Sequence, residues 1–329
     1  MPNRIAIYAH RGWIGSKIVK ALAESPASVK ILCRPGSSVV GLPSNVSAAN
    51  VDITDQADLI AALKDIDILI SLVGHDGIRS QHHLVEAIPK TEVQLFVPSD
   101  LAVRYAGQGL GIDLIRAKLE VEEHAKRLAV KTTTVLTGNL AEFALGTPAM
   151  GVDLLNNRII FTGDSASQPL NLWYAKFVHN TNLLSLTMLS TRSYVAAAYV
   201  SMFADTPIEI LENRTLSLSE LRPTGYDIQQ ALTTKFGVPP AQRTIPIERV
   251  SIQVDEMIKK GDPGALAWYT RKNWGNGDQL KFLGTDFWEV EGYTKATVKD
   301  LLVEEKLEEY RPLPKEFLDI LYVDYADCV

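Results

Sequence analysis

Two glycines near the start of the chain have the spacing of a phosphate-binding loop. Gly12 and Gly15 lie in the stretch YAHRGWIGS, between an apolar run that predicts a strand and a pattern that predicts a helix. Glycines at such a junction permit a tight turn and let backbone N–H groups approach a pyrophosphate. Ala9 replaces the first glycine of the usual pattern and permits the turn if its φ is negative. The predicted cofactor-binding residues are Ala9, Arg11, Gly12, Trp13, Ile14 and Gly15, and a purely structural turn is the alternative.

The end of the second predicted strand distinguishes between two dinucleotides. Arg34 and the following PGSS stand where an acidic residue would bind the ribose 2′-hydroxyl of NAD. An arginine favours a 2′-phosphate, so we expect NADP(H), held by Arg34 and Ser38, unless Arg34 is only a surface residue. Asp52, which ends the third predicted strand, is expected either to approach the adenine or to cap the turn at Thr54.

The ends of the later strands supply further candidates, because ligands of parallel sheets bind at the carboxyl ends of the strands. Each of these residues has an alternative role as an ordinary strand-to-loop residue. The predicted cofactor contacts are Val73 and Gly74 after the fourth strand, Pro98 and Ser99 after the fifth, and Gly138 and Asn139 after the sixth.

Lys118 is the candidate for acid–base chemistry. It lies at the border of the apolar stripe of a predicted helix over 112–128, where a long stem packs while the ammonium reaches outward. A partly desolvated lysine can exchange protons near neutrality. The alternative is a surface lysine paired with Glu122.

These residues must be positioned by an alternation of strands and helices over the first 140 residues. That alternation predicts an α/β fold with a doubly wound parallel sheet, and we place a cofactor-binding domain at 1–140. A smaller α+β substrate lobe follows at 141–329, with segments that return to the first domain. Strands are expected at 4–9, 29–34, 45–53, 66–74, 93–99 and 132–138.

Composition excludes several classes of function. The 329 residues carry a net charge of −6, with 46% hydrophobic and 22% charged residues and a mean hydropathy of +0.02, which is typical of a globular protein without affinity for nucleic acid. Cys33 and Cys328 are too few for a disulfide framework or a cysteine-based zinc site, and no other metal spacing is present. No apolar run is long enough to cross a membrane, so we expect a cytoplasmic protein, either a monomer or a homodimer.

The segments IYAHRGWIG, LCRPGSS, LFVPSD, RAKLEVEE and TVLTGNLAEF together resemble the NmrA-like and isoflavone-reductase-like group of atypical short-chain dehydrogenases/reductases, particularly its fungal members. The resemblance implies an NADP(H)-binding Rossmann domain and a C-terminal substrate lobe. It also implies that Lys118 contacts the nicotinamide ribose and acts as the acid/base. The tyrosine that ordinary members place four residues earlier is Leu114 here. Glu122 replaces an arginine of the plant reductases, so their specificity does not carry over.

The expected activity is NADPH-dependent reduction of a small aromatic or polyketide-like metabolite, by hydride transfer to a conjugated carbonyl or alkene. An NADP(H)-binding redox sensor without turnover is the alternative from a different class, and an isomerase or cyclase is a third. The stretch WYTRKNWGNGD is expected to form a mobile loop over the substrate, and a helix is expected to begin at Ser217 or Ser219. The predicted substrate contacts are His75, Phe143, Trp268 and Tyr269.

Overall fold

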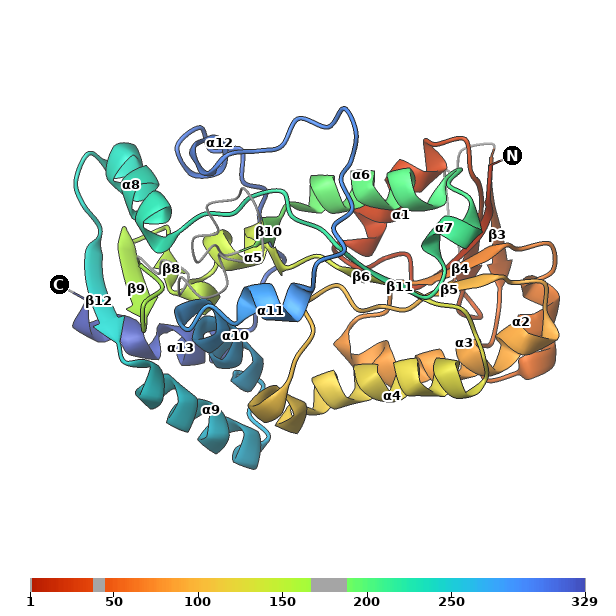
Figure 1. Ribbon diagram of the computed structural model, residues 1–329, viewed down its shortest axis with the longest axis horizontal. Helices are drawn as coiled ribbons and strands as arrows, with labels where there is room; N and C mark the ends of the chain where they lie inside the picture. The colour runs from red at the N-terminus through yellow and green to blue at the C-terminus, as the bar shows by residue number, and fades with distance from the viewer. Residues whose placement is uncertain (1, 38–44, 167–187, 329) are drawn as a thin grey trace.

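The first part of the chain forms a parallel sheet that is covered by helices on both faces (Figure 1). The computed structural model describes residues 2–37, 45–166 and 188–328. Within them the strand order is β3-β2-β1-β4-β5, and all neighbours are parallel. The strands are β1 (Arg4–Tyr8), β2 (Ser28–Cys33), β3 (Val46–Asn50), β4 (Ile68–Ser71) and β5 (Leu95–Val97).

Alternation along β1 divides the core of this sheet into two layers. Ile5 and Ile7 pack on one face, and Ala6 and Tyr8 pack on the other. One face is covered by α1 (Gly15–Ala23), α6 (Arg192–Phe203) and α7 (Ile208–Leu211). The opposite face is covered by α2 (Gln56–Ala62), α3 (Gln81–Ala87) and α4 (Asp113–Arg127). Short 3-10 turns accompany them: η1 (His75–Ser80), η2 (Ile88–Lys90) and η3 (Gly107–Gly111).

Segments beyond residue 140 return to extend this sheet. The strand β6 (Thr133–Leu136) lies beside β5 through a parallel bridge between Phe96 and Thr132. On its other side it pairs in parallel with β11 (Arg214–Ser217). Helix α6 packs against α1, so β11, α6 and α7 from the second part of the chain complete the first lobe.

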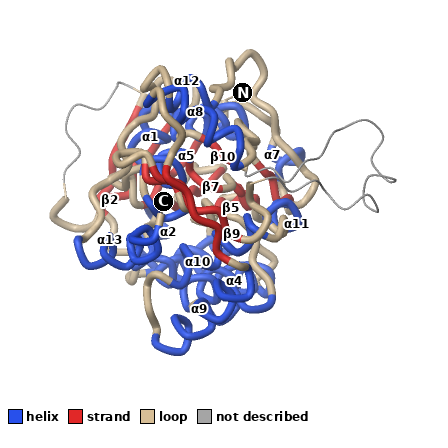
Figure 2. The backbone as a smooth tube through the Cα atoms, turned by 90° about the vertical axis from the view of Figure 1, so that its left-hand side faces the viewer, coloured by secondary structure: helices blue, strands red, loops and turns tan. Residues whose placement is uncertain are grey.

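The second lobe is built on a smaller mixed sheet in the order β12-β9-β8. Its strands are β8 (Val152–Asp153), β9 (Arg158–Thr162) and β12 (Ala241–Ile245), and a short parallel pair is formed by β7 (Asn139–Leu140) and β10 (Leu189–Ser190). In Figure 2 the helices α8 and α12 lie above these strands, and α9 and α10 lie below them. The helices and turns are α5 (Ala141–Gly146), η4 (Pro148–Met150), α8 (Gly225–Phe236), α9 (Ile247–Lys260), α10 (Ala265–Gly275), α11 (Gln279–Leu283), α12 (Val298–Leu302), α13 (Lys315–Tyr322) and η5 (Val323–Asp327).

The predicted doubly wound α/β fold with a smaller C-terminal lobe is confirmed, whereas two local predictions are wrong. The stretch 268–278 is not a mobile loop, because most of it belongs to α10, whose aromatic side chains fill the core of the second lobe. Ser217 does not cap a helix but ends β11. The helix that follows begins at Gly225, where Thr224 and Asp227 form a capping box.

Gly138 allows β7 to approach β10, and this generates a stability prediction. Its φ is +66°, and an added Cβ would lie 2.6 Å from the carbonyl oxygen of Met188. Gly138→Ala should lower the free energy of unfolding by about 2 kcal/mol or more in urea titrations, because it combines left-handed strain with a backbone clash. Gly36→Ala is the control, since Gly36 has a φ of +76° in open space and should cost about 1 kcal/mol. Equal losses would contradict the assigned close approach.

Candidate active site

The predicted phosphate-binding loop lies between β1 and α1, as expected, but one local prediction is wrong. The φ of Ala9 is +67°, not negative as predicted, so this alanine adopts the conformation that the usual glycine adopts freely. An added Cβ at Gly15 would lie 3.4 Å from both the Ala9 carbonyl oxygen and the Leu72 Cβ, so packing favours glycine there. At Gly12 the nearest atom would be 3.8 Å away, so protein packing does not require that glycine and its backbone is open to a ligand.

The N-terminus of α1 suits an anion. Ile14 precedes the helix without a side-chain cap, and the first turn contains no acidic residue. The first N–H groups of a helix lack partners within the helix and carry a partial positive charge. This end of α1 is therefore compatible with a phosphate group.

The end of β2 presents arginines and no carboxylate. The exposed Arg34 begins a turn in which the Ser37 N–H donates to the Arg34 carbonyl at 3.0 Å, with Pro35 and Gly36 between them. The neighbouring Cys33 is buried, which raises the pKa of its thiol, while the charge of Arg11 acts in the opposite direction. Both arginines therefore lie near the end of β2, and Ser38 lies outside the described residues.

Asp52 caps the turn at Thr54, which is the alternative to an adenine contact. Its Oδ1 accepts hydrogen bonds from the Thr54 hydroxyl at 2.7 Å and from the Thr54 N–H at 2.9 Å. These bonds lower the pKa of Asp52. The carboxylate stabilises the turn before α2, and contact with adenine stays a prediction.

The ends of β4 and β5 are tied together by Ser99. Its hydroxyl donates to the Val73 carbonyl at 2.8 Å, and its N–H donates to Gln81 Oε1 at 2.8 Å. Pro98 is buried, whereas Gly74 is exposed, and an added Cβ there would meet no atom within 4 Å. Of the predicted residues at these two strand ends, Gly74 therefore leaves the most room for a ligand.

The end of β6 has a mainly structural role. The backbone N–H of Gly138 donates to Ala102, and that of Asn139 donates to Met188. Among the described residues, the buried Nδ2 of Asn139 has no hydrogen-bond partner. Its amide therefore retains a donor at this edge of the sheet.

Lys118 pairs with Asp100, a residue that the sequence analysis missed. The Nζ atom lies 2.8 Å from Asp100 Oδ1, and the two side chains are 13% and 11% exposed. The expected alternative partner, Glu122, pairs with Arg104 instead. Arg104 also lies 3.6 Å from Asp100 Oδ2, so one network joins α4 to the loop after β5.

Two more side chains border this network. His75 lies at the start of η1, where part of its side chain is exposed. The surrounding protein atoms nevertheless desolvate the imidazole, and this effect, followed by the charges of Lys118 and Arg311, lowers the pKa of His75 and favours the neutral form. Tyr105 is close enough to Asp100 that the carboxylate adds to the effect of burial, and both raise the pKa of the phenol. His75 is therefore near enough to Lys118 to sense its charge, and Tyr105 is likewise near Asp100, whereas contact of His75 with substrate stays a prediction.

The aromatic residues predicted to meet substrate have different positions. Phe143 is half-buried, with its ring 5.2 Å from that of Tyr310. Trp268 and Tyr269 are only 0% and 2% exposed, so the structure places both in the core and not on a substrate-facing surface. The Trp268 ring packs against the buried Arg271. The Tyr269 hydroxyl donates to the Ala106 carbonyl at 2.7 Å and so supports the loop that carries Tyr105.

A segment from the second lobe covers the glycine loop. We call residues 308–311 the C-terminal strap. The Trp13 indole N–H donates to the Glu309 carbonyl at 3.3 Å, and the Trp13 ring meets the Tyr310 ring edge-on at 4.8 Å. Glu308 pairs with Lys17 in the first turn of α1. The strap therefore fixes the side chain of Trp13, which leaves its backbone as the predicted cofactor contact.

No group of three or more His, Cys, Asp or Glu side chains among residues 2–37, 45–166 and 188–328 is arranged to hold a metal ion. In the same ranges, no helix has the length and apolar character needed to span a bilayer.

Comparisons with known proteins agree with this geometry. The chain is 25% identical over 238 residues to the isoflavone reductase homolog IRL of Zea mays, covering 66% of this chain and 74% of that protein. It superimposes on the crystal structure of an isoflavone reductase with a TM-score of 0.72 at 17% identity, covering 93% of this chain and 100% of that one. The binary complex of leucoanthocyanidin reductase and NADPH from Vitis vinifera gives a TM-score of 0.71 at 17% identity, with the same coverage.

At such identities the two solved structures show a common fold. The family is shown by a model described as the NmrA-like family, which matches residues 1–261. That match spans well over half of the chain, and it confirms the resemblance seen in the segments around the glycine loop and Lys118. The chain belongs to the NmrA-like family.

Proposed function

We propose that this protein is an NADPH-dependent reductase of a small aromatic or polyketide-like metabolite. The observation that carries the proposal is the Lys118–Asp100 ion pair, a nearly buried proton donor that lies at the same edge of the sheet as the glycine loop. Relatives named as isoflavone reductase homologs and a solved neighbour that contains NADPH support the same activity. In this proposal residues 1–140 bind the cofactor and residues 141–329 form the substrate lobe.

The residues present fit NADP(H). The loop from Ala9 to Gly15 and the uncapped start of α1 would hold the diphosphate, because they offer backbone N–H groups and contain no acidic residue of their own. Arg34, with Arg11 nearby, would hold the 2′-phosphate at a strand end that lacks the carboxylate expected for NAD. Bound NADPH would supply a hydride to an electrophilic carbon of the substrate.

The chain itself supplies the proton. In the proposed reaction Lys118 donates a proton from Nζ to the substrate oxygen or carbon that becomes electron-rich when the conjugated carbonyl or alkene is reduced. Asp100 orients the ammonium, and Arg104 and Glu122 restrain Asp100. His75 and Phe143 would border the substrate, and the lowered pKa of His75 favours its neutral imidazole.

Cofactor preference tests the role of Arg34. The protein should bind NADPH more tightly than NADH, and Arg34→Ala should weaken NADPH about tenfold or more while leaving NADH unchanged, because a charge-assisted contact to the 2′-phosphate is lost. Fluorescence titrations measure both affinities. Arg127→Ala, at the exposed end of α4, is the matched control. Equal affinities of the unmodified protein for the two cofactors would remove the 2′-phosphate argument.

Turnover tests the role of Lys118. Enones and quinone-like metabolites are screened for NADPH oxidation, and on an active substrate Lys118→Met should lower kcat about a hundredfold or more. Lys131→Met, a substitution of a half-exposed lysine that pairs with Glu212, should leave kcat unchanged. Full turnover by Lys118→Met would exclude a catalytic role. NADPH binding without turnover of any substrate would instead favour the redox-sensor alternative.

The ion pair also has a stability signature. Asp100→Ala should lower the free energy of unfolding by about 3 kcal/mol, because it leaves the nearly buried Lys118 ammonium unpaired. The double variant with Lys118→Met should cost less than the sum of the two single losses. A urea double-mutant cycle measures this coupling, and the more exposed Lys131–Glu212 pair should give less than about 1 kcal/mol. Strict additivity at Lys118 and Asp100 would contradict the pairing.

A further inference from the structure

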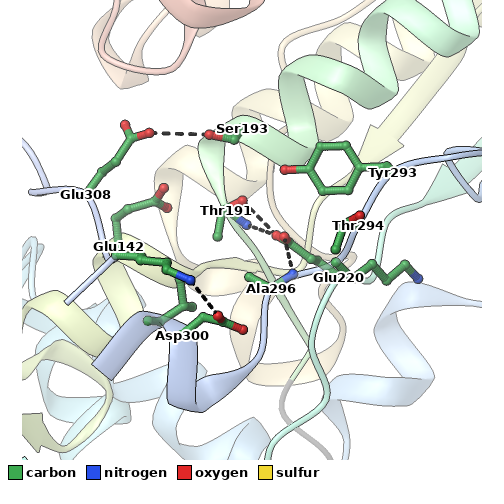
Figure 3. A pocket seen from close by; sticks show the side chains of 12 residues that line it. Glu142, Thr191, Ser193, Glu220, Tyr293, Thr294, Ala296, Asp300 and Glu308 are labelled. Atoms are coloured by element: carbon green, nitrogen blue, oxygen red, sulfur yellow. Dashed lines mark hydrogen bonds and ion pairs between the residues drawn. The ribbon is translucent and has the colours of Figure 1, made fainter. Parts of the chain in front are cut away.

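A cavity beside the start of α6 is separate from the residues assigned to cofactor and substrate. It has a volume of about 260 Å³, is open to solvent, and is bordered by the start of α6, by α5 and by the chain around α12 (Figure 3). At about 30 Å³ per water it has room for roughly eight waters or one small metabolite, and it is smaller than drug-sized pockets. None of the residues proposed above to bind cofactor or substrate lines it.

The lining of this cavity is more acidic than basic. Four carboxylates and two lysines face it: Glu142, Glu220, Asp300, Glu308, Lys295 and Lys306. Three of the carboxylates are fully engaged by the protein. Glu220 accepts from Thr191 and Ala296, Asp300 accepts from Thr297 and Lys306, and Glu308 pairs with Lys17 and Arg192.

Glu142 is the exception. Its side chain is 1% exposed, and its Oε1 accepts from the Arg192 backbone N–H at 2.8 Å. Its Oε2 is buried without a hydrogen-bond partner among the described residues. Burial raises the pKa of Glu142, and the charge of Glu308 adds to that effect. An unsatisfied buried acceptor is costly, and a ligand that donates a hydrogen bond would remove the cost.

We propose that the cavity binds a small primary amine, whose ammonium donates to Glu142 Oε2 and whose hydrocarbon chain packs against Leu301 and Ala296. The one carboxylate oxygen of the lining that lacks a partner, Glu142 Oε2, favours a ligand that donates a hydrogen bond, and a cation over an anion. Ala296 and Leu301 supply the apolar part of the lining, and Figure 3 shows Tyr293 and Thr294 on the side away from Glu142 and Glu308. A metal ion is a poor fit, because the other three carboxylates already have partners and no three-ligand group is present in the described part of the chain.

The amine site shares no lining residue with the Lys118–Asp100 pair of the proposed reductase. Lys118 and Asp100 are absent from the lining, and an amine needs neither NADPH nor turnover to bind. Binding is therefore measurable on the protein without cofactor. The amine site and the reductase proposal can fail independently.

The test uses three ligands of nearly equal size on the full chain: pentylamine, pentanol and pentanoate. Titration calorimetry, or ligand-observed NMR for weak binding, should show pentylamine binding at least tenfold more tightly than pentanol and no binding of pentanoate. Glu142→Gln should weaken pentylamine about tenfold or more, because the charge-assisted bond is lost. Glu305→Gln is the matched control, since Glu305 is a highly exposed carboxylate that does not line the cavity.

A second variant keeps the test decisive if Glu142→Gln does not fold. Ala296→Leu places a larger side chain in the cavity and should abolish pentylamine binding while Glu142 is retained. Equal affinities for amine and alcohol would overturn the proposal. Undiminished pentylamine binding in folded Glu142→Gln or in Ala296→Leu would overturn it as well.

Discussion

The parallel direction of β1 to β5 is the constraint on which the candidate site depends. Because neighbouring strands run the same way, all their carboxyl ends meet at one edge of the sheet. The glycine loop, Arg34, Gly74 and Asp100 are thus brought to one edge although they are far apart in the sequence. Helix α4 then places Lys118 against Asp100. The chemistry proposed for the protein is a consequence of strand direction and of one ion pair.

The second lobe contributes to this edge through the C-terminal strap. Trp13 is held by the Glu309 carbonyl, the Tyr310 ring and the Arg192 guanidinium, which lies 4.2 Å from the ring centroid. Arg192 begins α6, and its backbone N–H also binds Glu142. The glycine loop and the acidic cavity therefore share a neighbour, although their ligands would have opposite charge.

Much of the fold was predictable from the sequence, because buried parallel strands are nearly continuous apolar runs and the covering helices have a regular apolar stripe. Candidates for the site could be proposed from the sequence where a strand end falls beside a glycine or a basic residue, as at Gly12 and Arg34, and Lys118 from its place at the border of a helical apolar stripe. Asp100 follows Pro98 and Ser99 directly, so the same strand-end argument, extended by one residue, would have found it. Its pairing with Lys118 depends on the packing of α4, which sequence spacing does not define.

Other features required tertiary information. The positive φ of Ala9 is a property of the folded loop, and no local sequence pattern reports its sign. Aromatic residues occur both in protein cores and in pocket walls, and the sequence does not distinguish the two. Trp268 was therefore predicted to contact substrate although it is fully buried. Glu142 lies in the short helix α5, in no recognisable motif, so the sequence did not predict a ligand there. Its unpaired oxygen and the adjacent cavity are apparent only in the folded structure.

The contact between Trp13 and the strap has a consequence for the order of assembly. The two partners are separated by 296 positions in the chain, so joining them carries a large loss of chain entropy unless earlier folding has already brought them near. The first sheet, with its short crossovers, can form ahead of that closure. The nucleotide pocket would thus be finished last, when the lobes dock.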